Sequence, residues 1–502
     1  MALFRLRSKT KDNEVPSSQQ FSMPIHRAHD SNAAPRTDDP NEANVIADAS
    51  NPGGTNERPE DVIVSVVIPV YNSMPYLTEL MNSLEMQDLD KALFEVIAVD
   101  DGSTDFGGDI LDAYEKRNSN FFVVHQANSG WPGKPRNVGM AKARGQYVFF
   151  VDGDDRLGPE ALRRMTTYAR KHDVDVLVPK MVGIDGRRAP VKLFERTIRD
   201  VSYDFILRTL SPQKMVRKSL LDAHGIRFIE EKVRLEDGMV MVEAYSVANR
   251  ISILADYNYY EIRRRSDGQN ISTQQIEPAG YVSSLSKIAQ AVKVHAGDDI
   301  EVGRKQIAGL FKRKGLSFYR GQRFLRLDEA QRTSWVRSHA TFLERFGLTD
   351  PEATFNKQDA LRVRAILDCD LSALERLAQQ EVEAQRPPEA VRIEVTEELV
   401  ELTVEFPAEG PRPVSARVTD RDSAAQLETE ISIDTVDSIL TARFIREAIL
   451  SSVTRLGDIF LVYPDASTKR IKLGQKVSTR DAGGIRVYGT GNGFLSLDRR
   501  RA

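Results

Sequence analysis

Acidic side chains suited to binding metal ions follow two apolar runs in the first half of the sequence. Residues 147–151 lead into Asp152-Gly153-Asp154-Asp155, and residues 94–99 lead into Asp100-Asp101. Carboxylate oxygens are the hard ligands that Mg²⁺ or Mn²⁺ prefers when the ion also carries phosphate groups. A solvated turn after a strand has the same local composition. The acidic runs alone therefore leave a metal site and a turn both open.

A third acidic pair and a small basic cluster could supply the other parts of a reaction on phosphates. Asp237, next to Glu236, could take a proton from a hydroxyl group. Lys134 and Arg136 stand with Asn137 at an expected helix start, where cations and free amide groups favour phosphate. Taken singly, the acids are typical of the first turn of a helix, and the cations of solvated surface.

The elements between these residues predict how they are positioned. Near-continuous β-branched runs at residues 62–72, 94–99 and 147–151 are typical of strands buried on both faces. Helical spacing separates them, for example at residues 77–84 and 159–171. Strands that alternate with helices form a mostly parallel sheet, so we expect a Rossmann-like α/β domain. Its polar clusters then gather at the carboxyl ends of the strands, where ligands bind.

The composition limits the classes of function. The chain has 502 residues, enough for about three domains, and its net charge of -3 offers no bulk attraction for nucleic acid. One cysteine, Cys369, cannot form an internal disulfide or a cysteine metal cluster. No apolar run reaches the roughly 18 residues needed to span a bilayer. We therefore expect a cytoplasmic protein.

Residues 1–60 are rich in Ser, Asn, Asp, Pro and Gly, which predicts a disordered tail. Its basic cluster, residues 5–11, is typical of such a tail, and could also touch the inner face of an anionic membrane.

The spacing of apolar residues changes twice in the second half of the chain. Residues 278–388 carry helical spacing and predict a small helical subdomain or linker. From residue 389 to 502 short runs alternate with a period of two, which predicts an Ig-like β-sandwich. That domain carries no catalytic cluster, so we expect it to serve oligomerisation or polymer binding, or packing alone.

Four motifs in a fixed order, residues 66–72, 99–105, 135–139 and 150–155, resemble those of family 2 glycosyltransferases with the GT-A fold. Glu236-Asp237 resembles the Glu-Asp catalytic motif of that family. The likeness covers about residues 62–275, so we expect a GT-A domain at residues 61–277. Within the family, the Gly133 to Asn137 motif and the long C-terminal extension are most similar to the transferases that attach β-N-acetylglucosamine to wall teichoic acid.

The resemblance implies a role for each candidate residue. Nucleotide-sugar binding is implied for Pro69, Tyr71, Asp101, Lys134, Arg136, Asn137 and Asp152. A direct bond to Mn²⁺ or Mg²⁺ is implied for Asp154. Asp237 would be the general base, with Glu236 orienting hydroxyl groups. Arg263 and Arg264 would contact the diphosphate or an anionic acceptor.

The resemblance also implies the reaction. One base and one displacement predict an inverting transfer of a sugar, most simply N-acetylglucosamine from its UDP donor, to a cell-wall or capsular polymer such as a poly(polyol phosphate). Three alternatives stay open: an exopolysaccharide acceptor, a lipid-linked acceptor, and a non-catalytic scaffold that binds polymer through the C-terminal domain. A homo-oligomer built through that domain is a further expectation.

Overall fold

The computed structural model describes residues 62–268, 270, 276–408, 410–434 and 438–499. The expected N-terminal tail lies outside the described residues. Buried apolar side chains form two separate hydrophobic cores, one built from residues between Ile63 and Ala378 and one from residues between Ala390 and Leu497. The candidate site residues all belong to the part of the chain that builds the first core.

A seven-stranded sheet of order β3-β2-β1-β4-β8-β6-β9 forms the centre of the first core. All neighbouring strands are parallel except β8, which runs antiparallel to both β4 and β6. The predicted mostly parallel α/β sheet is therefore confirmed. Its strands are β1 Val64–Val70, β2 Phe94–Asp100, β3 Phe121–His125, β4 Tyr147–Phe150, β6 Val176–Pro179, β8 Met215–Arg217 and β9 Ile251–Leu254.

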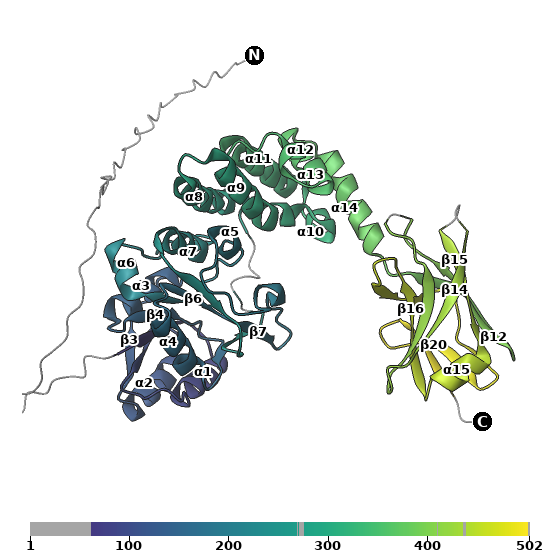
Figure 1. Cartoon of the computed structure of the whole chain (residues 1–502), viewed down its shortest axis with the longest axis horizontal. Coiled ribbons are helices and arrows are strands. Elements are labelled where there is room, and N and C mark those ends of the chain that lie inside the picture. The colour runs from purple at the N-terminus through teal and green to yellow at the C-terminus, as the bar shows by residue number, and fades with distance from the viewer. Residues whose placement is uncertain (1–61, 269, 271–275, 409, 435–437, 500–502) are drawn as a thin grey trace, which may run out of the picture. The chain divides into compact units, whose positions relative to one another are not determined.

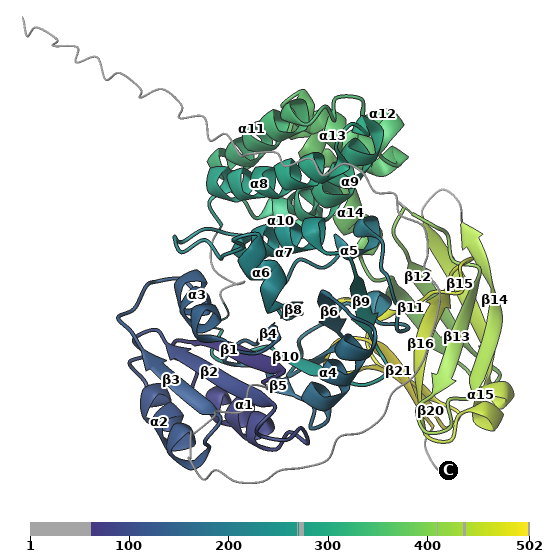
Figure 2. The same cartoon turned by 60° about the vertical axis from the view of Figure 1, so that its left-hand side comes forward.

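Helices cover both faces of this sheet. Figure 2 shows α1 (Tyr76–Glu85) and α2 (Gly107–Arg117) on one face of β1 to β3, and α3 (Gly133–Lys142) on the other. Gly139 lets α3 approach the sheet closely, since a Cβ atom there would lie 2.5 Å from Val67 Cγ1. This close packing fixes the start of α3 beside the carboxyl ends of β1 and β4.

A smaller sheet, of order β5-β10-β7, flanks those strand ends. Tyr260 of β10 packs against Phe149 of β4 with ring centroids 6.1 Å apart, which joins the two sheets. The remaining elements of this part are β5 Arg156–Leu157, α4 Ala161–Lys171, β7 Met181–Ile184, η1 Val191–Leu193, α5 Tyr203–Ile206, α6 Lys218–Ala223, α7 Glu236–Val247 and β10 Tyr260–Arg263.

Helices alone make up residues 278–385 (Figure 1). Their core includes stacked aromatic rings, with Phe318 and Trp335 centroids 3.8 Å apart. Because their buried side chains continue the first core, helices α8 and α9 lie close enough to contribute to the candidate site. The elements are α8 Pro278–Ala296, α9 Ile300–Lys314, η3 Leu316–Tyr319, α10 Gly321–Leu325, α11 Glu329–Arg345, α12 Pro351–Thr354, α13 Lys357–Leu367 and α14 Leu371–Gln385.

The C-terminal domain is all-β apart from the short helix α15 (Arg446–Ser452), as its period of two predicts. Instead of two separate stacked sheets, its strands follow one hydrogen-bonded path, β18-β11-β12-β15-β14-β13-β16-β21-β20-β19, which curls around the second core. The strands are β11 Glu389–Val395, β12 Leu399–Glu405, β13 Ser415–Asp420, β14 Gln426–Asp434, β15 Ile439–Ile445, β16 Leu456–Val462, β17 Thr468–Arg470, β18 Lys472–Leu473, β19 Arg480–Ala482, β20 Ile485–Gly489 and β21 Leu495–Arg499.

Candidate active site

A cleft of about 1340 Å³ opens at the carboxyl ends of β1, β2 and β4 and extends to the start of α7 and to helices α8 and α9. Most of the predicted site residues meet there, although they come from six separate segments. Those that line the cleft are Pro69, Tyr71, Asp101, Arg136, Asp152, Asp154, Glu236, Asp237 and Arg263. The lining does not include Lys134, Asn137 or Arg264.

At the end of the cleft next to β2, Asp101 is buried and held by hydrogen bonds. Gln126 Nε2 donates to its Oδ1 at 2.5 Å, and the Ser129 hydroxyl donates to its Oδ2 at 2.7 Å. Tyr71 is about half exposed on the opposite wall. A fixed carboxylate facing an accessible aromatic ring suits a nucleoside, whose ribose hydroxyls donate hydrogen bonds and whose base stacks.

Arg136 occupies the centre of the cleft floor and is buried. Its Nη1 donates to Asp237 Oδ1 at 2.6 Å, and its Nη2 donates to Asp152 Oδ1 at 2.8 Å. Burial by itself lowers the pKa of Arg136, but the carboxylates of Asp237 and Asp152 outweigh that effect and raise it. A permanently charged guanidinium therefore joins two acidic motifs that lie 85 residues apart in the chain.

This geometry differs from the sequence-based role of Arg136, because both of its terminal nitrogens already bind protein carboxylates. The neighbouring candidates also have other positions. Asn137 donates to the Phe228 carbonyl at 2.8 Å and to Glu230 Oε1 at 3.0 Å, so it holds the loop before α7. Lys134 is exposed on the surface of α3. Diphosphate binding by these three residues stays a prediction.

The carboxylates that follow β4 are crowded. Asp152 accepts a second hydrogen bond, at its Oδ2, from Gln213 Nε2 at 2.6 Å. Burial and the nearby Asp152 raise the pKa of Asp154 to about 6. Asp155 is fully enclosed, with its pKa raised by burial and by both neighbours, and it accepts from the Tyr260 hydroxyl at 2.7 Å.

Asp152 raises the pKa of both Asp154 and Asp155, and carboxylates crowded in this way gain from a divalent cation, so the donor set fits Mg²⁺ or Mn²⁺. Asp154 would hold the ion, because its side chain accepts one long hydrogen bond, 3.3 Å from Asn270, whereas the side-chain oxygens of Asp152 and Asp155 accept shorter ones. Within the described residues no group of three or more His, Cys, Asp or Glu side chains is arranged as a metal cage. That is the usual arrangement for an ion that takes most of its ligands from substrate phosphates and water.

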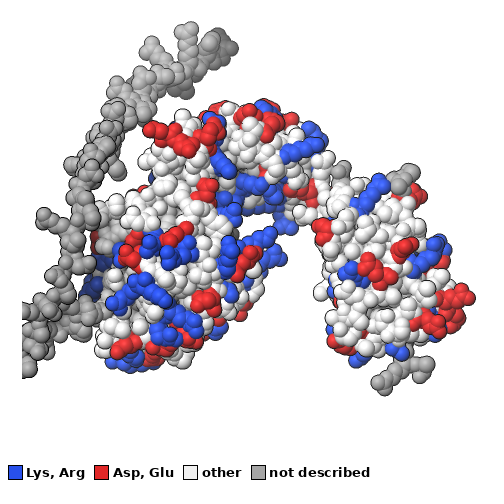
Figure 3. All heavy atoms as spheres, in the orientation of Figure 1, with Lys and Arg blue, Asp and Glu red and all other residues white. Residues whose placement is uncertain are grey.

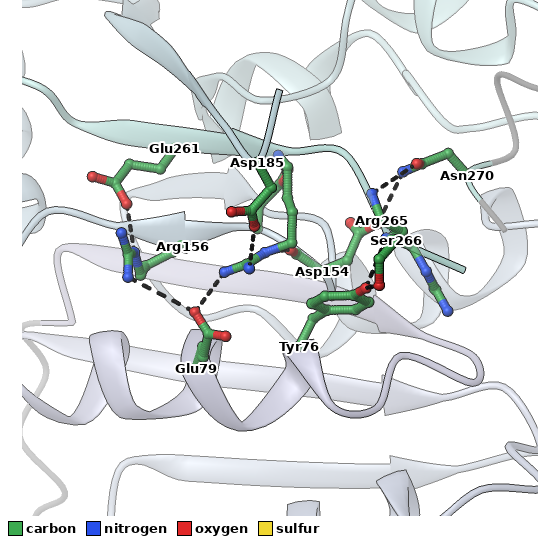
Figure 4. Close-up of polar contacts among 11 residues, drawn as sticks. Tyr76, Glu79, Asp154, Arg156, Asp185, Glu261, Arg265, Ser266 and Asn270 are labelled. Carbon is green, nitrogen blue, oxygen red and sulfur yellow. Dashed lines mark hydrogen bonds and ion pairs between the residues drawn. The ribbon is translucent and has the colours of Figure 1, made fainter. Parts of the chain in front are cut away.

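Arg263, at the end of β10, is buried and fully engaged. Its guanidinium donates to Glu79 Oε2 and to Asp185 Oδ2, each at 2.5 Å. Figure 4 labels these two carboxylates. Arg264 points to solvent, whereas Arg265 lines the cleft and donates to the Asn72 carbonyl at 3.0 Å. Of the three consecutive arginines, Arg265 and Arg263 both act on Asp154 through their charge, whereas Arg264 does not line the cleft.

Glu236 and Asp237 begin helix α7, after Leu235 in a left-handed conformation with φ of 62°. That turn directs both acids toward the cleft. Burial and the adjacent Asp237 raise the pKa of Glu236 to about 7. Burial also raises the pKa of Asp237, and Arg136 is the strongest of the charges that oppose this rise. Asp237 is therefore a partly exposed carboxylate beside a fixed cation, as a general base requires.

The sequence-based reasoning missed one wall of the cleft. The loop between α5 and β8 brings Arg208 and Gln213 to the cleft, and the end of α9 brings Lys314. Burial lowers the pKa of Arg313, and the like charge of Arg208 lowers it further. Burial and the charge of Arg313 lower the pKa of Lys314 in the same way. No local motif marks these residues. A run of three basic residues at 312–314 was the available signal, and only the tertiary packing connects it with Asp237.

Comparison with protein families agrees with this geometry. The model described as "Glycosyl transferase family 2" matches residues 65–230, and the one described as "Glycosyl transferase TarS linker domain" matches residues 278–378. These two stretches contain the sheet with its acidic strand ends and the helices that close the cleft.

Curated relatives are similar to this chain over somewhat more than half of its length. The poly(ribitol-phosphate) beta-N-acetylglucosaminyltransferase TarS of Staphylococcus aureus is 37% identical over 283 residues, which is 56% of this chain and 49% of the relative. The poly(ribitol-phosphate) beta-glucosyltransferase of Bacillus spizizenii is 36% identical over 287 residues, 56% of this chain and 44% of the relative. The chain thus spans about half the length of these relatives.

Among solved structures, S. aureus TarS 1–349 in complex with UDP-GlcNAc superposes with a TM-score of 0.56 at 31% identity. The match covers 66% of this chain and 94% of that structure. Separately, none of the helices within the described ranges has the length and apolar content needed to cross a bilayer.

Proposed function

Because the chain belongs to glycosyl transferase family 2, we propose that it transfers N-acetylglucosamine from UDP to a hydroxyl group of a polyol-phosphate polymer of the cell wall, with inversion at the anomeric carbon. The observation that carries this proposal is the position of Asp237. It opens onto the cleft beside Arg136 and Asp152, where the reacting end of a donor would lie.

The donor would lie along the strand ends. The nucleoside would occupy the end of the cleft between Tyr71 and Asp101. Its diphosphate would lie over Asp154, where a bound divalent ion would neutralise the charge that develops on the leaving UDP. Arg265 lines the same region and adds a cation from the protein. The sugar would then point toward Asp152 and the start of α7.

Transfer needs a hydroxyl nucleophile on the far side of the sugar. Asp237 would accept the proton of that hydroxyl while the new bond to the anomeric carbon forms and the bond to UDP breaks. Arg136 keeps this carboxylate ionised and oriented. With one base and one displacement, an α-linked donor gives a β-linked product.

The charge around the base favours an anionic acceptor. Arg208 and Lys314 line the cleft, and neither has a carboxylate in contact among the described residues. Figure 3 shows Lys and Arg side chains gathered along the lower edge of the helical region. Unpaired cations beside a base suit a polymer whose hydroxyl groups alternate with phosphates. The names of the staphylococcal and bacillar relatives support the same acceptor class.

Those names differ in the sugar, so glucose is the second candidate. Purified protein with Mn²⁺ and poly(ribitol phosphate) should release UDP from UDP-N-acetylglucosamine, and the Asp237→Asn variant should bind the donor but lose about 10² to 10⁴ in rate. If the protein prefers UDP-glucose as its donor, the transferred sugar is glucose instead of N-acetylglucosamine. A protein that consumes neither donor, or an Asp237→Asn variant with full activity, would overturn the proposal.

A further inference from the structure

Lys214 is a buried cation to which the proposed reaction assigns no task. Its side chain is 0% exposed. The ammonium donates to Thr209 Oγ1 at 3.0 Å, to the Ser211 carbonyl at 2.6 Å and to Ser211 Oγ at 3.0 Å. All three partners are neutral. A buried ammonium without a carboxylate in contact is costly, so its presence needs an explanation beyond packing.

The residues around Lys214 connect it with the elements that carry Asp152 and Asp237. Its carbonyl accepts from Phe150 N, the last residue of β4, just before Asp152. The Thr209 carbonyl accepts from the Tyr245 hydroxyl at 2.8 Å, which ties the Lys214 loop to helix α7. The loop also packs on the first turn of α7, where a Cβ atom at Gly238 would lie 3.5 Å from Leu210 Cβ. Lys214 is therefore enclosed between the strand that presents Asp152 and the helix that presents Asp237.

The charges that act around Asp237 come from every element packed against its end of α7. Burial lowers the pKa of Lys214 to about 7, and the charge of Asp237 opposes that fall; Lys214 in turn opposes the rise in the pKa of Asp237. Arg136 alone cannot balance the acids, because it is shared among three carboxylates. Among the largest effects on the pKa of Asp237, the charge of Asp152 is opposed by the charges of Arg136, Lys214 and Lys314.

The three cations differ in their access to solvent. Lys314 is partly exposed at the cleft wall and is available to an acceptor, whereas Lys214 has no exposed surface. The Lys214 ammonium is thus out of reach of a substrate phosphate, and below its pKa of about 7 it carries its charge.

We propose that Lys214 is a positioning residue whose enclosed ammonium keeps the Asp237 carboxylate ionised, so that Asp237 can accept the acceptor proton while Arg136 and Lys314 are shared with other charges. This inference rests on the proposed role of Asp237 as the base. It assigns to the α5–β8 loop a function in catalysis that acts through charge.

The test is the pH dependence of kcat/KM for sugar transfer, measured with UDP-N-acetylglucosamine, Mn²⁺ and poly(ribitol phosphate). Lys214→Met keeps the length of the side chain and removes its charge. Its acid limb should move to higher pH by about one unit, the size expected for a charge acting at close range in a protein. Lys293→Met, at an exposed position on α8, is the matched control and should follow the wild type.

Two more variants distinguish the effect of the Lys214 charge from the effect of its hydrogen bonds to the loop. Lys214→Arg keeps the charge, and Thr209→Val removes one hydrogen bond while leaving the charge. Both should have the acid limb of the wild type. If Lys214→Met does not fold, Lys214→Arg decides: a wild-type limb supports the proposal, and a displaced limb overturns it. An unmoved limb in folded Lys214→Met also overturns it.

The same experiment distinguishes the two levels of inference. If Asp237→Asn keeps full transfer, the proposed base is wrong, and the role of Lys214 falls with it. If Asp237→Asn loses transfer but the acid limb of Lys214→Met stays in place, only the role of Lys214 is wrong.

Discussion

Arg136 Nη1 lies 2.6 Å from Asp237 Oδ1, so the proposed base is bound by a guanidinium that is almost fully buried. The same guanidinium binds Asp152. One residue of α3 therefore connects Asp152, which follows β4, with Asp237 in the first turn of α7. Changes at Arg136 should affect proton transfer as well as donor binding.

Arg136→Met should move the acid limb of kcat/KM to higher pH. Arg136 is the strongest charge opposing the burial that raises the pKa of Asp237, so its removal lets that pKa rise further and leaves less of the base ionised at low pH. A pH-rate profile of the variant against wild type measures the shift. Arg136→Lys should shift the limb less, because it keeps the charge but loses the two-pronged contact. Superposable profiles for Arg136→Met and wild type would rule out this role.

Asp154→Asn should lose metal-dependent donor binding. The raised pKa of Asp154, about 6, reflects burial and crowded negative charge that a divalent ion would relieve. UDP with Mn²⁺ should raise the melting temperature of wild-type protein, since a ligand that binds the native state stabilises it. That rise should disappear in the variant, and transfer should fall by roughly a hundredfold or more. Asp298→Asn, an exposed acid before α9, is the control. An unchanged Mn²⁺ effect in Asp154→Asn would remove Asp154 from the metal site.

Lys314→Gln combined with Arg208→Gln should raise KM for the polymer about tenfold, which corresponds to about 1.4 kcal/mol. KM for the donor should change little, because Lys314 acts on Asp237 and both cations belong to the wall that we assign to the acceptor. The wild-type KM for the polymer should also rise with salt, and that dependence should weaken in the variant. Initial rates at two salt concentrations measure both effects. Arg337→Gln, on the exposed face of α11, should behave as wild type. If the double variant raises donor KM instead, these cations belong to the donor site.

The sequence predicted the parts of the fold whose signals are local. The β-branched runs gave β1, β2 and β4 within a few residues, because strands buried on both faces need such side chains. The acids after β4 and at the start of α7 could be found because they stand next to those elements. The resemblance to the family is what assigned Asp154 to the metal and Asp237 to proton transfer.

The partners of these acids could not be predicted in the same way. Arg136 was placed in the cleft, but its bonds to Asp152 and Asp237 depend on how closely α3 packs over β1, which a single glycine controls. Gln213 and Lys214 stand in a loop without a motif, and they matter only because β8 returns antiparallel beside β4. Such contacts come from tertiary packing, for which no short-range sequence pattern exists.

The two hydrophobic cores have a consequence for how this chain can change over evolutionary time. Among the residues that the structure describes, none contributes to both cores, and the residues proposed for catalysis all belong to the part that builds the first. Mutations that reshape the curled sheet of residues 389–499 can therefore accumulate without disturbing the packing that aligns Arg136 with Asp237. Substitutions in the C-terminal domain and substitutions around the proposed catalytic residues can therefore be selected independently of each other.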